Sequence, residues 1–417
     1  MSLPRALALS LALVLAGLGA LGGEGAWFAA ALPLAAWALA GEFVAPPRIS
    51  LEAERTLSET FADSGAPVEI SVNVRNRGPR LEALQVSDAL PPGAILVSGS
   101  AQWRGSLELG AEAELRYVAT LPRGLWRFEE VRAVALDPFF DLGAEAVIPC
   151  PQAIVVPPKP LSPPKAAFGA GAVRPFAGQT RASRTGSGID FSATRDYSPG
   201  DPLRSLNRKA EMRWGRTIVN LREEGRAIDA GVILDSRASA YADAGLFESC
   251  AAAALTVAEL LLDQGCRVAF MSSGAGIDWV PPGMGRTQRL RVRRAAAAAR
   301  LGDHATFERF EALPTRIFPP RSLVAVASPL LERDLAPLRS FAALGYSVVA
   351  LRPDPLAAPR RALEARPDDE ASRLALRLAS AESRFLLSRL LGSGVSVLAW
   401  DPGLPLASAR LLGEAAS

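Results

Sequence analysis

The chain has 417 residues, of which 49% are hydrophobic and 21% charged, and its formal net charge is +3. This length allows two or three folded domains, and the apolar content excludes a mainly disordered chain. One histidine and three widely separated cysteines exclude a multi-histidine metal site, a CxxC zinc site and a disulfide framework.

Two uncharged apolar runs, residues 6–23 and 26–41, lie at the N-terminus on either side of a glycine-rich turn. Each run, as a helix, approaches the thickness of a bilayer core, and Trp27 and Trp37 are placed like interface residues. We expect residues 1–45 to form a transmembrane helical hairpin that contacts lipid. A cleaved signal peptide is the alternative.

Basic residues flank the hairpin and predict its orientation. Arg5 precedes it, Arg48 and Arg55 follow it, and the connecting turn has no basic residue. The positive-inside rule therefore places the N-terminus and the large C-terminal part in the cytoplasm. Arginine far outnumbers lysine and alanine is abundant, which is typical of GC-rich bacteria. Together with the predicted hairpin, this composition leads us to expect a two-pass protein of the bacterial inner membrane.

Residues 46–157 consist of short runs in which apolar and polar residues alternate. VEISVNVRN (Val68–Asn76) is an example, and turn signals such as Pro91-Pro92-Gly93 recur about every ten residues. This pattern predicts an antiparallel β-sandwich domain.

Residues 158–227 contain a Pro- and Gly-rich linker and then the most distinctive segment, GSGIDFSATRDYSPGDPLRSLNRK. Its alternating aspartates and arginines predict charge-assisted hydrogen bonds. Two interpretations stay open: a brace that fixes the linker against the next domain, or a surface that docks a partner. The candidate residues are Gly186, Gly188, Asp190, Phe191, Arg195, Tyr197, Pro199, Gly200, Asp201, Arg204, Asn207 and Lys209.

Residues 228–417 alternate between buried apolar runs and helical patterns. Strands are predicted at 230–235, 266–271, 322–328, 346–351 and 395–400, with helices at 246–262 and 289–300. This alternation is typical of a doubly wound α/β domain. Ligands bind such sheets at the C-terminal strand ends, so Asp235 and its loop are the place to look.

The distinctive segment resembles the signature of the bacterial and archaeal family called domain of unknown function 58. The candidate residues above, together with Leu206, match its pattern, and Arg208 departs from it because tryptophan is usual there. The resemblance implies a von Willebrand factor A-like fold for residues 228–417. It also implies a partner, the MoxR-type AAA+ ATPases.

Von Willebrand factor A domains often bind a metal through a D-x-S-x-S loop and a threonine from another loop. Asp235, Ser239 and Thr287 are the candidates here, but Arg237 replaces the middle serine, and a cation there would oppose Mg²⁺. Asp235 would instead cap the next helix or pair with Arg237. We expect no metal and no other cofactor.

The remaining candidates for chemistry are weak. The arginines of residues 286–294 have no interleaved aromatic residues, which indicates a solvated helix face and no nucleic-acid partner. His304 is the only possible base of a triad and has no nucleophile nearby in its pattern. We therefore expect that the protein is not an enzyme.

The expected function is that of a membrane-anchored, non-catalytic adaptor or assembly factor that acts with a MoxR-type ATPase in protein maturation or complex assembly. Other membrane or envelope proteins are further possible partners. The alternative is a metal-dependent adhesion or ligand-binding module that uses Asp235, Ser239 and Thr287.

Overall fold

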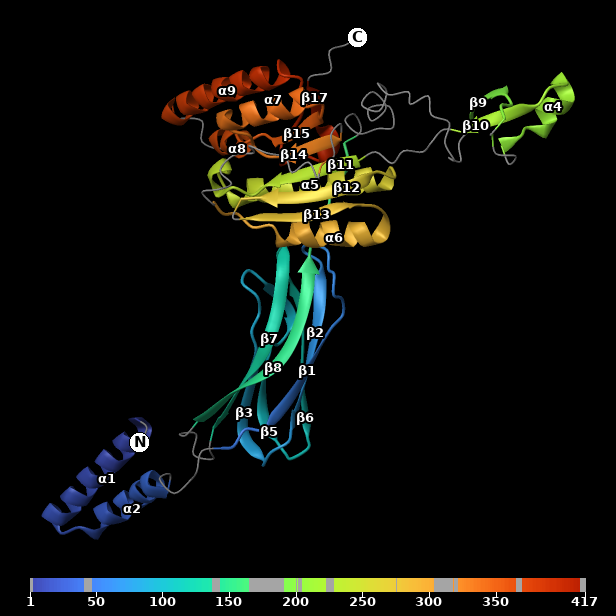
Figure 1. Ribbon diagram of the computed structural model, residues 1–417. Coiled ribbons are helices and arrows are strands. Elements are labelled where there is room, and N and C mark those ends of the chain that lie inside the picture. Colours follow the sequence, from blue (N-terminus) through green and yellow to red (C-terminus); the bar gives the residue numbers. More distant parts are fainter. Residues whose placement is uncertain are drawn as a thin grey trace. The chain divides into compact units, whose positions relative to one another are not determined.

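The computed structural model of the protein (Figure 1) describes residues 3–40, 47–136, 143–164, 191–199, 201, 205–222, 229–274, 276–303, 318, 322–364 and 370–412. The chain divides into two compact units, Met1–Lys159 and Pro160–Ser417. The division falls close to residue 157, where the second predicted domain ends.

Two N-terminal helices, α1 (Leu3–Gly22) and α2 (Gly25–Ala40), coincide with the predicted apolar runs. Gly23 turns the chain between them with a φ of 70°. The helices pack against each other so closely that a Cβ atom at Gly19 would lie 2.9 Å from the ring of Phe28. The predicted helices are confirmed.

By length and composition, one helix among the described residues could cross a membrane, α5 (Ala244–Asp263). It is mostly buried inside the C-terminal unit, as a core helix would be. The apolar stretches Ala6–Gly22 and Gly25–Leu39, which lie in α1 and α2, are shorter than α5.

The rest of the first unit consists of two four-stranded antiparallel sheets, as predicted. Their orders are β1-β2-β6-β4 and β5-β3-β7-β8. Alternate residues of both sheets point into one shared core. The strands are β1 (Leu51–Leu57), β2 (Pro67–Asn76), β3 (Leu81–Asp88), β4 (Ile95–Gly99), β5 (Gln102–Leu107), β6 (Glu112–Thr120), β7 (Gly124–Leu136) and β8 (Gly143–Val156).

A buried polar cluster joins the two sheets. Arg55 of β1 donates to Asp88 of β3 at 2.7 Å, and neither side chain is exposed. The hydroxyl of Tyr117 on β6 donates to the same carboxylate at 2.7 Å. Arg55 also donates to the carbonyl oxygens of Glu130 and Cys150. The Arg55 guanidinium thus supplies the Asp88 carboxylate, which has no access to solvent, with hydrogen bonds that water would otherwise donate.

The second unit begins with a small hairpin that carries the distinctive segment. Its strands β9 (Phe191–Asp196) and β10 (Ile218–Arg222) pair antiparallel, and the short helix α4 (Arg208–Trp214) lies between them in sequence.

The main sheet of this unit has seven strands in the order β13-β12-β11-β14-β15-β16-β17. The five predicted strands are present and parallel, but the sheet is mixed because antiparallel strands β13 and β17 form its edges. The strands are β11 (Asp229–Asp235), β12 (Arg267–Ser273), β13 (Ile277–Gly283), β14 (Leu323–Ala327), β15 (Ser347–Pro353), β16 (Ser396–Trp400) and β17 (Arg410–Leu412).

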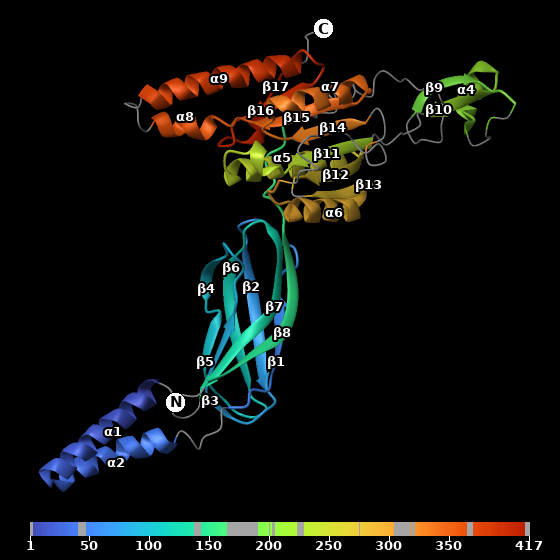
Figure 2. The same cartoon turned by 60° about the vertical axis from the view of Figure 1, so that its left-hand side comes forward.

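Helices cover both faces of this sheet (Figures 1 and 2). Helices α5 and α6 (Gly285–Ala298) pack on one face, and α7 (Leu335–Ala343) and α9 (Glu370–Leu391) on the other. Val232 and Leu234 therefore face α5, whereas Ile233 faces the opposite core. Helix α8 (Ala357–Glu364) packs against α9.

Candidate functional site

The order of the parallel strands reverses beside the central strand. Strand β12 lies on one side of β11 and β14 on the other, so the switch point lies between β11 and β14. Asp235 ends β11 and Ser328 follows β14, and the Ser328 hydroxyl donates to the Asp235 carboxylate at 2.6 Å. This hydrogen bond spans the place where open α/β sheets bind ligands.

Arg237 fills this place with its guanidinium group. Its Nε and Nη2 donate to the two carboxylate oxygens of Asp235 at 2.9 and 2.8 Å. Its Nη1 and Nη2 donate to those of Asp334, each at 2.9 Å. All three side chains are at most 1% exposed. One cation therefore bridges two buried carboxylates.

A tight turn delivers Asp334 from the loop after β14. Leu330 has a φ of 61°, a left-handed conformation that is uncommon for leucine, and its N–H donates to the Ser328 hydroxyl at 3.0 Å. The turn leads into the short 3₁₀ helix η4 (Glu332–Asp334). The N–H of Leu331 then donates to Asp334 at 2.9 Å.

Further donors surround the two carboxylates. The backbone N–H of Arg237 donates to Asp235 at 3.0 Å, and the Tyr241 hydroxyl donates to the Asp235 carbonyl. Burial alone would lower the pKa of Arg237, but its hydrogen bonds to Asp235 and Asp334 raise that pKa above its ordinary value. The guanidinium is thus held charged, and each oxygen of the two carboxylates accepts at least one hydrogen bond.

The three residues expected for a metal site do not come together. Asp235 pairs with Ser273 at the end of β12. Thr287 lies at the start of α6, next to Gln288, whose side chain donates to the carbonyl of Val268 near the beginning of β12 at 2.7 Å. Because β13 returns antiparallel to β12, it carries Thr287 to the opposite end of the sheet from Asp235.

Ser239 lies at the exposed rim of the switch point. Its hydroxyl accepts a hydrogen bond from Arg333 at 2.8 Å, and its N–H donates to Asp303 at 3.2 Å. Within the described residues there is no group of three or more His, Cys, Asp or Glu side chains that could hold a metal. The residues at this edge do not fit a divalent cation, because the Arg237 guanidinium takes the position between the carboxylates.

The distinctive segment forms a second candidate site on the hairpin. Gly186, Gly188, Asp190, Gly200 and Arg204 lie outside the described residues. Phe191 begins β9, Arg195 lies in β9, and Tyr197, Pro199 and Asp201 follow it. Asn207 precedes α4 and Lys209 lies within it.

The described residues of this segment mostly bond to one another. Arg195 donates to Asp201 at 2.7 Å, and the N–H of Ser198 donates to the same carboxylate at 2.9 Å. The hydrogen bond from Ser198 and then that from Arg195 lower the pKa of Asp201. Asn207 caps α4 by accepting from the N–H of Ala210 at 3.1 Å. The network fixes the local path of the chain.

This hairpin presents apolar and basic side chains at its surface. Helix α4 has no buried residue, and Met212 and Trp214 are 86% and 57% exposed. Arg208, Lys209 and Arg213 belong to the same helix. Exposed large apolar groups beside positive charge are typical of a protein interaction surface.

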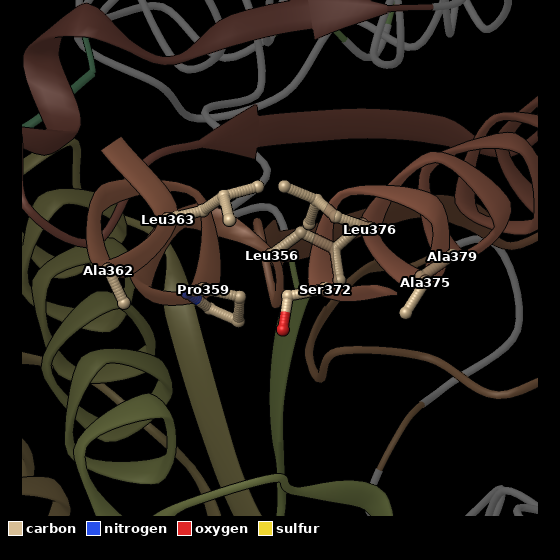
Figure 3. A pocket seen from close by; sticks show the side chains of 8 residues that line it. All are labelled: Leu356, Pro359, Ala362, Leu363, Ser372, Ala375, Leu376 and Ala379. Carbon is tan, nitrogen blue, oxygen red and sulfur yellow. The ribbon is translucent and has the colours of Figure 1, made fainter. Parts of the chain in front are cut away.

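An apolar hollow of about 440 Å³ lies between α8 and α9 (Figure 3). Ser372 is the one polar side chain in its lining, so the hollow brings together no set of groups for acid–base or metal chemistry. The lining residues are Leu356, Pro359, Ala362, Leu363, Ser372, Ala375, Leu376 and Ala379.

Comparison with protein families identifies this region. Residues 193–357 match the family described as "Protein of unknown function DUF58". This match confirms the predicted resemblance over that region. No curated protein matches the chain in sequence.

Two solved structures illustrate likenesses to parts of the chain. A CARDB domain from Pyrococcus furiosus, in complex with di-metal ions, is 16% identical with a TM-score of 0.16, and the match covers 26% of this chain and 92% of that one. The cupredoxin domain of amoB from Nitrosocaldus yellowstonii is 11% identical with a TM-score of 0.20, covering 29% and 95%. At these scores neither likeness supports an inference about function.

Proposed function

We propose that the chain is a membrane-anchored, non-catalytic adaptor that acts with a MoxR-type AAA+ ATPase in maturing or assembling other proteins. Its C-terminal domain would be a von Willebrand factor A-like docking platform. The family match over residues 193–357 supports the association with the ATPase by resemblance. A central strand that ends in Asp235, at the switch point of a mostly parallel sheet, supports the A-like fold.

The bridge from Arg237 to Asp235 and Asp334 is the observation that carries this proposal. In a metal-dependent module, these carboxylates would hold a cation that a ligand completes. Here both are already paired with a side chain of the same domain. The loop is therefore held in one conformation, which suits a platform for protein contacts better than a metal-dependent ligand site.

The proposed anchor is the pair of apolar helices α1 and α2. They would place the protein in the bacterial inner membrane as a two-pass hairpin, with the large C-terminal part in the cytoplasm, where an ATP-dependent partner has its nucleotide. The side chains of Met212 and Trp214 on α4 are exposed. For this reason the β9–β10 hairpin, which carries the family signature, is the proposed contact with the ATPase.

Affinity purification of the full chain from its own cells, with and without ATP, tests this function. We expect an AAA+ ATPase to be retained by the wild type and to fall about tenfold with Met212→Ser, Trp214→Ser, because an exposed tryptophan often dominates an interface. Leu109→Ser is the matched control, since Leu109 is 69% exposed in the first unit. Absence of any AAA+ protein in every condition would refute the adaptor.

A thermal-shift titration with Mg²⁺ tests the alternative. The adaptor predicts an unchanged melting temperature, whereas a bound metal at about 100 times its Kd would stabilise the domain by about 2.7 kcal/mol. A saturable rise that is lost in Asp235→Asn would favour the metal-dependent module instead.

A further inference from the structure

Helix α9 has apolar residues on two opposite faces. Its inner face packs on the sheet and on α8 through Leu376, Leu386 and Leu390, the last of which is 1% exposed. Figure 3 shows Leu376 directed toward α8 across the apolar hollow. This face alone accounts for the attachment of the helix to its domain.

The outer face of α9 carries a second apolar row, which we name the outer seam. It consists of Ala371, Leu374, Leu378, Ala381 and Phe385, all exposed. Leu374, Leu378 and Phe385 are 60%, 59% and 63% exposed, so three large apolar side chains face away from the domain. Packing within the domain therefore gives no reason for this row.

The spacing of the outer seam indicates what would cover it. Its members are separated alternately by three and four residues, a repeat of 3.5 that keeps a narrow row facing one partner helix. A helix that lies on a bilayer has a broader apolar face. Two small alanines, Ala371 and Ala381, stand among the larger residues of the seam and leave room for side chains of a second helix.

The charges beside the seam indicate the character of the partner. Arg373, Arg377 and Arg384 line one side of it and are exposed. The other side carries Glu382 and Arg389, and Arg389 is already paired with Glu332. Within the part of the chain that the structure describes, no carboxylate pairs with these three groups. A helix with acidic residues next to its own apolar row would complement them.

A second copy of α9 fits the seam less well than an acidic helix. In a parallel pair, Arg377 of one helix would approach Glu382 of the other, but Arg384 would approach Arg389, which is already paired with Glu332. In an antiparallel pair, Arg377 would approach Arg384. Like charges in these flanking positions oppose pairing.

We propose that the outer seam of α9 docks an acidic amphipathic helix of a partner protein. This inference deepens the proposed adaptor function and rests on it, because it assigns one surface through which the adaptor would hold another protein. The partner is defined by its chemistry: leucine-like residues at spacings of three and four, flanked by glutamate or aspartate.

Two designed peptides of 22 residues, the length of α9, test the seam against the full chain in mild detergent. Both have leucine at the seam spacing; one has glutamate and the other lysine at the flanking positions, so neither pairs with itself. Fluorescence anisotropy should show that the glutamate peptide binds at least about tenfold more tightly than the lysine peptide.

Two variants make the test specific. Arg377→Glu, Arg384→Glu should reverse the preference between the peptides. Leu374→Ser, Leu378→Ser, Phe385→Ser should abolish the binding of both, while circular dichroism and the melting temperature stay close to those of the wild type because these residues are exposed. Equal binding of the two peptides, or a preference that the charge reversal leaves unchanged, would overturn the inference.

Other occupants of the seam give different results. If the triple serine variant instead loses binding to phosphatidylserine vesicles, the seam is a lipid surface. If it loses self-association in sedimentation, the seam pairs two copies. Either result overturns the proposal of a partner helix. The retention of the AAA+ ATPase is read separately, so the adaptor function can stand or fall independently of the peptide preference.

Discussion

At the position where the D-x-S-x-S pattern has its middle serine, this chain has Arg237, and that side chain joins two loops. Asp235 is 2 residues away in sequence, and Asp334 is 97 residues away. The cost of removing three charged groups from water is offset only because each donor and acceptor meets a partner. The cluster therefore depends on all three residues together.

Replacing Arg237 by alanine should destabilise the C-terminal domain by about 3–5 kcal/mol, because two buried carboxylates would then face each other without a cation. Urea unfolding followed by circular dichroism measures the loss. Arg333→Ala is the control, since Arg333 lies at the exposed rim and donates to the Ser239 hydroxyl at 2.8 Å. An Arg237→Ala midpoint as high as that of the control would show that the bridge contributes little.

The residues of the candidate site were only partly predictable. Asp235 was found because it ends an apolar run, and strand ends bind ligands in such sheets. Asp334 was missed because its contact with Arg237 depends on the left-handed turn at Leu330. Thr287 was predicted from a motif alone. In the structure it lies at the opposite end of the sheet because β13, which precedes it, runs antiparallel to β12.

Among the elements, burial determined which strands the sequence pattern could predict. Strands β11, β12, β14, β15 and β16 have helices on both faces and therefore show continuous apolar runs. Strand β13 was missed because it lies at the edge, where Trp279 is 52% exposed and Pro281 and Pro282 are tolerated. Strand β17 has three residues and leaves too short a pattern.

The central strand β11 depends on close approach at Gly231. A Cβ atom there would lie 2.1 Å from the ring of Phe318, which is 1% exposed. Gly231→Ala should lower the free energy of unfolding by about 1–3 kcal/mol or more, because the buried ring must move. Gly276→Ala, where nothing lies within 4 Å of the added atom, is the matched control for denaturant unfolding.

A companion variant identifies the cause. If the clash with Phe318 is responsible, Gly231→Ala combined with Phe318→Ala should lose less than the sum of the two single changes. Additive losses would place the effect elsewhere.

At the scale of the whole molecule, each of the two units has a core of its own, and the three cysteines are distributed between them. Cys150 is buried in the first unit, and Cys250 and Cys266 are buried in the second. Burial raises the pKa of all three thiols, so the folded chain has little reactive thiolate. The cysteines are therefore natural reporters of unfolding in each unit.

We expect iodoacetamide at pH 8 to leave the native chain unlabelled and to label the cysteines in two steps as urea rises. Cys150 should follow one midpoint, and Cys250 and Cys266 a second one. Because Arg55 lies in the core of the first unit, Arg55→Ala should shift only the Cys150 midpoint, measured by mass spectrometry of the labelled peptides. Joint movement of all three midpoints would contradict independent cores.

The bridge at Arg237 also has a consequence for control. A metal ion in such a site exchanges with solvent, so its occupancy follows the ion's concentration and a chelator empties it. The Arg237 guanidinium, in contrast, is covalently attached to the chain, so it cannot leave the site as a bound ion does, and a chelator cannot remove it. The conformation of the loop around it consequently does not depend on the concentration of a metal ion at this position, and a switch of the proposed platform would need a different trigger, such as a binding event on its surface.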